Sequence, residues 1–122
     1  MRPLLIFDFD GVIADSEVLS NTVLAETISA LGLPTTVEEC YRLYMGKRVP
    51  EIAAVIGERL GRPLADTFID ELQAATFERF RRELCTVAGA QDYLDAYADL
   101  PRCIATSSAP ARLTLCLDIL GL

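Results

Sequence analysis

The stretch Leu4-Leu5-Ile6-Phe7-Asp8-Phe9-Asp10-Gly11-Val12-Ile13-Ala14-Asp15-Ser16 decides the fold. Residues 4–9 form a short, continuous apolar run without helical spacing, which predicts a buried strand. The run passes into two acids separated by one residue, and Gly11 then opens a turn in which a bulky residue would be costly. Ligands of open parallel α/β sheets bind at the carboxyl ends of the strands, and acids gathered there either pair with cations or perform chemistry. The stretch therefore predicts an α/β core with a candidate site at its edge.

The segment Asp8-Phe9-Asp10-Gly11-Val12-Ile13-Ala14-Asp15-Ser16-Glu17 resembles the first signature motif of the haloacid dehalogenase-like hydrolase superfamily. Within that superfamily it is most similar to the sugar-phosphatase and β-phosphoglucomutase branch. A lone D-x-D would more simply be an acidic, solvated strand end. The glycine, the following Asp15-Ser16 and a second motif downstream favour the functional interpretation.

The composition limits the class of protein and its partners. A chain of 122 residues is in the range of one ordinary domain, and 52% hydrophobic with 24% charged residues indicates a globular protein. The net charge of −7 argues against a nucleic acid or an anionic membrane as the partner. A phosphorylated small molecule stays compatible with this charge, because a bound cation and backbone donors can reverse the field at one site.

The cysteines and the N-terminus indicate the compartment. The chain has no histidine to complete a zinc site, so the cysteines are predicted to be small buried apolar side chains in a reducing cytosol. They are Cys40, Cys85, Cys103 and Cys116. The N-terminal apolar run is too short for a signal peptide or a membrane span, so we expect a cytoplasmic protein.

Helical spacing and cap signals predict an insertion between two strands. Four helices are expected before residue 84: residues 17–31, a helix from the capping box at Thr36 to about Tyr44, one beginning near Pro50, and 64–83. The pattern then predicts a hinge at 85–90, a helix over 90–98 and a strand over 102–106. A last helix follows, with Ser108 as candidate N-cap and Pro110 near its first position.

The connection between the two strands is too long for one crossover, so residues 16–84 are predicted to be a separate helical lobe. The core is then residues 1–15 and 85–122, with two strands. The family resemblance implies the same architecture, an α/β Rossmann-like parallel sheet with an inserted α-helical cap.

The resemblance also implies the chemistry, in which Asp8 is the nucleophile that forms an aspartyl-phosphate. Asp10 protonates the leaving alcohol and then activates water, a role that a neighbouring carboxylate would favour by keeping Asp10 partly protonated. Two acids repel a dianionic phosphate, and a divalent cation removes that conflict. The family binds Mg²⁺ through the side chain of Asp8, the backbone carbonyl of Asp10 and an acid of a later motif.

A second motif, Ile104-Ala105-Thr106-Ser107-Ser108, resembles the family segment whose hydroxyl binds the phosphoryl group. Thr106 is the favoured hydroxyl and Ser107 the alternative by a shift of one residue. Backbone N–H groups at the start of the following helix would add donors for an anion.

Substrate choice is expected to depend on the inserted lobe. In the family, residues after a glycine equivalent to Gly46 reach the core site, so Lys47 and Arg48 are candidates to bind a second anionic group of the substrate. A solvated basic loop is an equally weighted alternative. Asp15 is expected to brace the turn rather than to perform chemistry.

Two departures from the family pattern keep alternatives open. The absence of histidine disfavours a mutase, and Asp10 argues against dehalogenation. The Lys and the metal-binding acids of later motifs are not found after Thr106, and a two-stranded sheet with an unpaired apolar edge is marginal. The chain is therefore predicted to be the N-terminal half of a longer enzyme, or to be completed by a partner such as a second copy. The alternatives are an inactive binding or dimerisation module, or a phosphosugar mutase.

Overall fold

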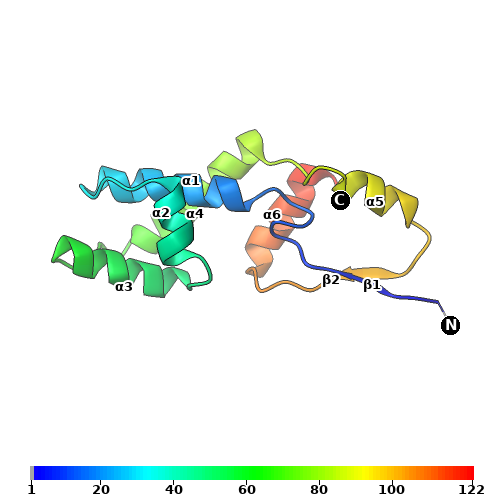
Figure 1. The fold of residues 1–122 in the computed structure, drawn as a ribbon, viewed down its shortest axis with the longest axis horizontal. Coiled ribbons are helices and arrows are strands. Elements are labelled where there is room, and N and C mark those ends of the chain that lie inside the picture. The colour runs from blue at the N-terminus through cyan, green and yellow to red at the C-terminus, as the bar shows by residue number, and fades with distance from the viewer. Residues whose placement is uncertain (1) are drawn as a thin grey trace. The chain divides into compact units, whose positions relative to one another are not determined.

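The computed structural model describes residues 2–122, which form two compact units (Figure 1). One unit contains Val18–Arg79. The other contains Phe80–Leu122 together with the chain up to Glu17. Both strands belong to this second unit, so the sheet is assembled from segments that lie far apart in the sequence.

The sheet consists of β1 (Leu5–Phe7) and β2 (Arg102–Ile104), which pair in parallel. Leu5 lies opposite Arg102 and Phe7 opposite Ile104, so the predicted two-stranded parallel sheet is confirmed. Both strands are shorter than predicted. The chain leaves β1 early because the Phe9 carbonyl accepts the N–H groups of residues 12–14, which closes a tight turn in place of further strand pairing.

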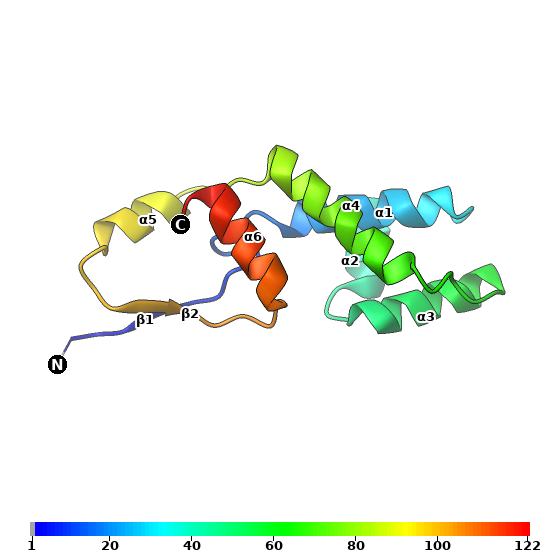
Figure 2. The ribbon, with the colours of Figure 1, turned by 180° about the vertical axis from the view of Figure 1, so that it is seen from behind.

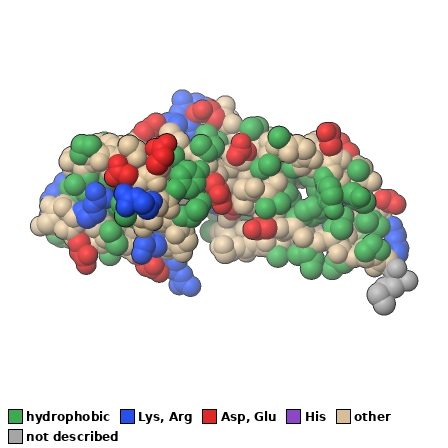
Figure 3. Space-filling view, in the orientation of Figure 1, with side chains coloured by type: hydrophobic (Ala, Val, Ile, Leu, Met, Phe, Trp, Pro, Cys, Tyr) green, Lys and Arg blue, Asp and Glu red, His purple; other side chains and the backbone are tan. Residues whose placement is uncertain are grey.

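Helices α5 (Ala90–Ala96) and α6 (Pro110–Leu120) complete the sheet unit. The Tyr93 ring of α5 meets the Phe7 ring edge-on, with centroids 5.9 Å apart, so α5 contributes to the cover on the side of the sheet to which Phe7 points. Leu4, directly before β1, is 56% exposed, and Ile6 within β1 is 63% exposed. Figure 3 shows hydrophobic side chains over much of this unit's visible surface. Parallel sheets usually have both faces covered, and the alternate side chains of β1 are here open to solvent.

The start of α6 differs from the prediction. Ala109, in an extended conformation, is the N-cap and makes no side-chain cap, whereas Pro110 occupies the first turn as expected. The predicted cap by Ser108 is therefore wrong, because its hydroxyl bonds to a side chain from another segment.

The helical unit is built from α1 (Glu17–Ala30), α2 (Val37–Tyr44), α3 (Val49–Leu60) and most of α4 (Phe68–Glu83). In Figure 2 α4 crosses in front of α1, and the Arg79 guanidinium donates to the Glu26 carboxylate across these two helices at 2.8 Å. Apolar side chains from all four helices form one core: Val23, Leu24, Ala25, Ile28, Cys40, Tyr44, Ile52, Ile56, Phe68 and Leu72.

The cap signals of this unit are confirmed in part. The Thr36 hydroxyl accepts from the Glu39 N–H at 3.1 Å, and the Glu39 carboxylate accepts from the Thr36 N–H, as a capping box requires. By contrast, α4 begins at Phe68 rather than at Leu64, because the Phe68 N–H donates to the Ala65 carbonyl in a preceding turn.

The cysteines are free and divide into two classes. Cys40 and Cys116 are buried, and burial raises the pKa of both thiols. The predicted burial is wrong for Cys85 and Cys103, which are exposed. Within residues 2–122, no helix combines the length and the apolar character needed to cross a membrane.

Candidate active site

The carboxylate of Asp10 accepts hydrogen bonds from three side chains of the sheet unit. The hydroxyl of Ser16 donates to its Oδ1 at 2.6 Å, and the guanidinium of Arg112 donates to the same oxygen at 3.0 Å. The Ser108 hydroxyl donates to Oδ2. Both oxygens are therefore engaged, by residues from two parts of the chain, the turn after β1 and the start of α6.

Local geometry at Gly11 brings Ser16 to Asp10. Gly11 has φ of +78°, a left-handed conformation that favours glycine. The turn is anchored to a distant segment, because the Asp15 N–H donates to the Cys85 carbonyl and the Val87 N–H to the Ile13 carbonyl. The backbone of Asp15 thus braces the turn, and a bracing role of its side chain stays a prediction.

Arg112 reaches Asp10 from the first turn of α6. Its guanidinium lies over the ring of Phe80, 5.1 Å from the centroid, while Phe80 itself is fully buried. The side chains of Arg112 and Asp10 are only 26% and 18% exposed. Partial burial on an aromatic ring makes this ion pair less screened than a surface pair.

These contacts determine the protonation state of Asp10. Burial by itself would raise the pKa of the Asp10 carboxyl, but the hydrogen bonds from Ser108 and Ser16 and the charge of Arg112 outweigh it, so the pKa lies below its ordinary value. We expected a neighbouring carboxylate to keep Asp10 partly protonated. That expectation is wrong for this arrangement, because the nearest groups are donors and a cation, which stabilise the ionised form.

A pH-dependent contribution to stability follows from this shift. A carboxyl with a lowered pKa in the folded state stabilises the fold above its unfolded-state pKa and loses that effect as the pH falls through the folded-state value. We therefore expect the difference in free energy of unfolding between wild type and Asp10→Asn to be larger at about pH 6 than at about pH 2.5. Urea denaturation in the presence of a chelator measures this difference. A difference that is the same at both pH values would contradict the contacts described for Asp10.

Asp8 and Thr106 follow the ends of the two paired strands. Asp8 is exposed, and its Oδ1 accepts from the Phe9 N–H at 2.8 Å. The Thr106 hydroxyl accepts from the Ser108 N–H at 3.1 Å. Since the Ser108 hydroxyl bonds Asp10, Ser108 links the predicted phosphoryl-binding residue to the predicted acid. Ser107, the alternative to Thr106, is exposed.

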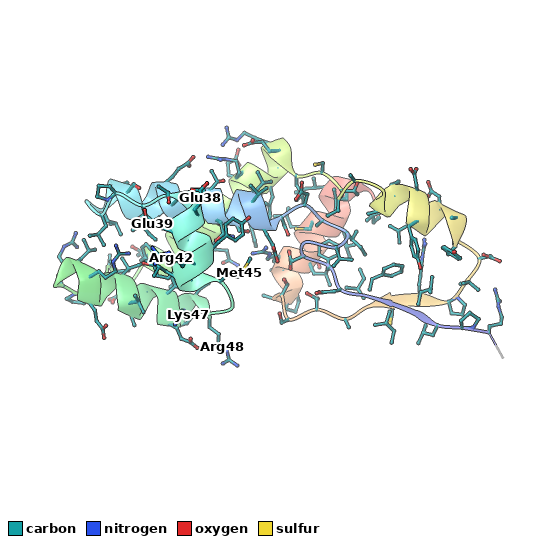
Figure 4. All side chains as sticks on the ribbon, viewed as in Figure 1. Glu38, Glu39, Arg42, Met45, Lys47 and Arg48 are labelled. Carbon is teal, nitrogen blue, oxygen red and sulfur yellow. The ribbon has the colours of Figure 1, made fainter. Side chains whose placement is uncertain are left out.

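The other predicted residues lie in the helical unit. Gly46 has φ of +82°, which favours glycine, and Lys47 and Arg48 are exposed. Figure 4 places Lys47 and Arg48 in the loop between α2 and α3, and Figure 3 shows basic side chains over this part of the unit. A contribution of these residues to the Asp10 site stays a prediction.

The donors of the candidate site suit Mg²⁺ in kind. The exposed carboxylate of Asp8 and the carbonyl of Asp10 are hard oxygen ligands. Among residues 2–122, no group of three or more His, Cys, Asp or Glu side chains is placed to hold a metal. This small donor set still fits Mg²⁺, which commonly keeps several waters and binds through one or two carboxylates and the substrate phosphate.

Sequence reasoning missed two partners of Asp10. It assigned Ser108 to a helix cap and gave Arg112 no role. One signal was present: Arg112 lies in the first turn of α6, where the helix dipole disfavours a cation, so an acid nearby was to be expected.

A family model described as haloacid dehalogenase-like hydrolase matches residues 5–122. The chain belongs to this family. The match includes both strands and the helical unit inserted between them, so family membership rests on almost the whole chain.

The individual relatives of this haloacid dehalogenase-like chain are longer proteins. It is 28% identical over 104 residues to a 6-phosphogluconate phosphatase from Escherichia coli strain K12, covering 84% of this chain and 47% of that protein. A haloacid dehalogenase-like protein of unknown function from Agrobacterium tumefaciens superposes with a TM-score of 0.83 at 28% identity, covering all of this chain and 55% of its own length.

A haloacid dehalogenase-family hydrolase from Deinococcus radiodurans, solved with bound phosphate and sodium, has a TM-score of 0.75 at 24% identity. The match covers 53% of that protein and 100% of this chain. The chain thus spans about half the length of these relatives.

Proposed function

We propose that the protein hydrolyses phosphate monoesters of small, sugar-like metabolites through an aspartyl-phosphate on Asp8, with Mg²⁺ as cofactor. The observation that carries this proposal is the arrangement at the ends of β1 and β2. An exposed carboxylate, Asp8, precedes an acid held by three donors, and Thr106 is linked to that acid through Ser108. Membership of a hydrolase family supports the reaction class.

The first half of the reaction transfers the phosphoryl group to the protein. A carboxylate oxygen of Asp8 attacks phosphorus, the bond from phosphorus to the ester oxygen breaks, and Asp10 gives a proton to the leaving alcohol. The Thr106 hydroxyl and the Ser107 N–H donate to phosphoryl oxygens. Asp8 and the Asp10 carbonyl would hold Mg²⁺, which when bound would supply charge stabilisation of the transferring group.

The second half restores Asp8. Water attacks phosphorus, Asp10 takes the proton of that water, and the bond between phosphorus and the Asp8 oxygen breaks to release inorganic phosphate. The contacts described for Asp10 suit this half, because they keep its carboxylate ionised. For the first half Asp10 must carry a proton; on Oδ2 that proton can be accommodated if the Ser108 hydroxyl turns from donor to acceptor, while Arg112 keeps its contact with Oδ1.

We propose that Lys47 and Arg48 select substrates that carry a second anionic group. Both are exposed cations that follow the glycine at 46. The Escherichia coli relative is named for 6-phosphogluconate, a molecule with a carboxylate as well as a phosphate. Paired cations bind a second anionic group well. The cytoplasmic location and the small-molecule partner stay predictions from the sequence.

Phosphate release from an aryl phosphate and from 6-phosphogluconate tests the proposal, with Mg²⁺ and with excess chelator. We expect release with Mg²⁺ and a loss of at least about 100-fold with chelator, reversed by added Mg²⁺. No release from a sample whose circular dichroism shows it to be folded would contradict a hydrolase role for this chain by itself.

The same sample distinguishes the alternatives. An oligomer seen by size-exclusion chromatography with light scattering, together with no phosphate release, would favour the binding or dimerisation module, for which the exposed Leu4 and Ile6 are the motivating observation. Transfer of phosphate to another position of a sugar, without free phosphate, would favour the mutase.

A further inference from the structure

We propose that Arg112 is a positioning residue for Asp10, and that it acts on the rate of the chemical step rather than on the binding of phosphate. This inference rests on the proposed function, in which Asp10 is the acid and base. Nothing in that function by itself assigns a role to a residue of α6.

The Arg112 guanidinium contacts both the Phe80 ring and the Asp10 carboxylate. One side is covered by the ring of the fully buried Phe80, at 5.1 Å from its centroid. A donor nitrogen lies 3.0 Å from Asp10 Oδ1. A planar, stacked guanidinium loses little freedom when it forms such a bond, so it holds its partner in one orientation.

The two oxygens of the Asp10 carboxylate have different partners. Arg112 and Ser16 hold Oδ1, while Ser108 holds Oδ2. With both oxygens bonded, rotation of the carboxylate requires breaking at least one of these contacts. An acid that has to reach both a leaving oxygen and a water gains from being held within a fraction of an ångström of its working position.

The charge of Arg112 is paired with the carboxylate of Asp10. An arginine that binds substrate phosphate presents its donors to the ligand, whereas here one guanidinium nitrogen donates to Asp10 and the Phe80 ring lies against the group. Removing Arg112 is therefore expected to disturb Asp10 and to leave the affinity for phosphate esters nearly unchanged.

Steady-state kinetics of Arg112→Gln, Arg112→Lys and the control Arg102→Gln test this inference. Arg102 lies in the same unit and donates to the Leu94 backbone carbonyl at 2.7 Å, so it matches the arginine chemistry without contacting an acid. We expect Arg112→Gln to lower kcat roughly ten- to a hundred-fold with KM changed by less than about two-fold. Arg112→Lys should have a kcat several-fold higher than that of Arg112→Gln, because lysine retains the positive charge.

Two kinetic outcomes would overturn the inference. A raised KM with unchanged kcat in Arg112→Gln would make Arg112 a direct phosphate ligand. Equal losses in Arg112→Gln and Arg102→Gln would indicate general destabilisation of the unit.

A double-mutant cycle separates failure of this inference from failure of the proposed function. Urea midpoints are compared for wild type, Asp10→Asn, Arg112→Gln and the double variant. Additive shifts would overturn the Arg112–Asp10 contact, whatever the activity. Non-additive shifts would support the Arg112–Asp10 contact. If the protein then shows no turnover, the hydrolase proposal and the catalytic part of this inference are both overturned.

Discussion

Asp8→Asn is expected to lower phosphate release by at least about a thousand-fold under saturating substrate and Mg²⁺. The amide keeps the Oδ1 acceptor for the Phe9 N–H, which is bonded at 2.8 Å, so the turn is retained. What is lost is the anionic oxygen that attacks phosphorus. Continuous detection of released phosphate from an aryl phosphate measures the effect.

Asp118→Asn is the matched control for this variant, since Asp118 is an exposed acid on α6 of the same unit. It should retain wild-type turnover. A second measurement isolates the intermediate: wild type quenched during turnover of labelled substrate should carry a phosphoryl group, and Asp8→Asn should not. Turnover retained in Asp8→Asn would eliminate Asp8 as the nucleophile.

Asp10→Asn is expected to lower turnover of alkyl phosphates roughly 100- to 10,000-fold. An amide can neither give a proton to the leaving oxygen nor take one from water. An aryl ester needs less help in the first step, because a phenolate leaves without a proton. We therefore expect the variant to release close to one equivalent of the phenol as a burst, followed by slow turnover, in rapid-mixing experiments.

The dependence on the leaving group is what separates this role from structural damage. Asp10→Asn also removes the charge partner of Arg112, so a loss of stability accompanies it. Reduced stability lowers the rates of aryl and alkyl esters equally. Equal losses without a burst would therefore contradict the acid and base assignment, and circular dichroism of the variant shows whether it has folded.

Much of the local structure was predictable because its causes are local. The apolar run predicted β1, Gly11 predicted the turn that its φ of +78° requires, and the Thr36 capping box predicted the start of α2. Predictions failed where one signal competed with another. Ser108 has the chemistry of an N-cap, but its hydroxyl bonds Asp10, and the first turn of α6 begins one residue later.

Cysteine burial shows the same limit in another form. The residue type alone predicted four buried thiols, and the structure buries Cys40 and Cys116 only. Exposure of Cys103 depends on which side of β2 is covered, and that is a property of the assembled sheet.

By itself, the sequence determined the strand that ends in Asp8 and Asp10, the glycine turn, the second strand and the helices inserted between them. These follow from apolar periodicity, backbone freedom and capping, which act over a few residues. Tertiary structure alone decided the state of Asp10. Its partners Ser108 and Arg112 lie 98 and 102 residues further along the chain, and they reach it only because β1 pairs in parallel with β2 and thereby brings the start of α6 to the end of β1. A carboxylate responds to the donors and charges within a few ångströms, and no local pattern contains them.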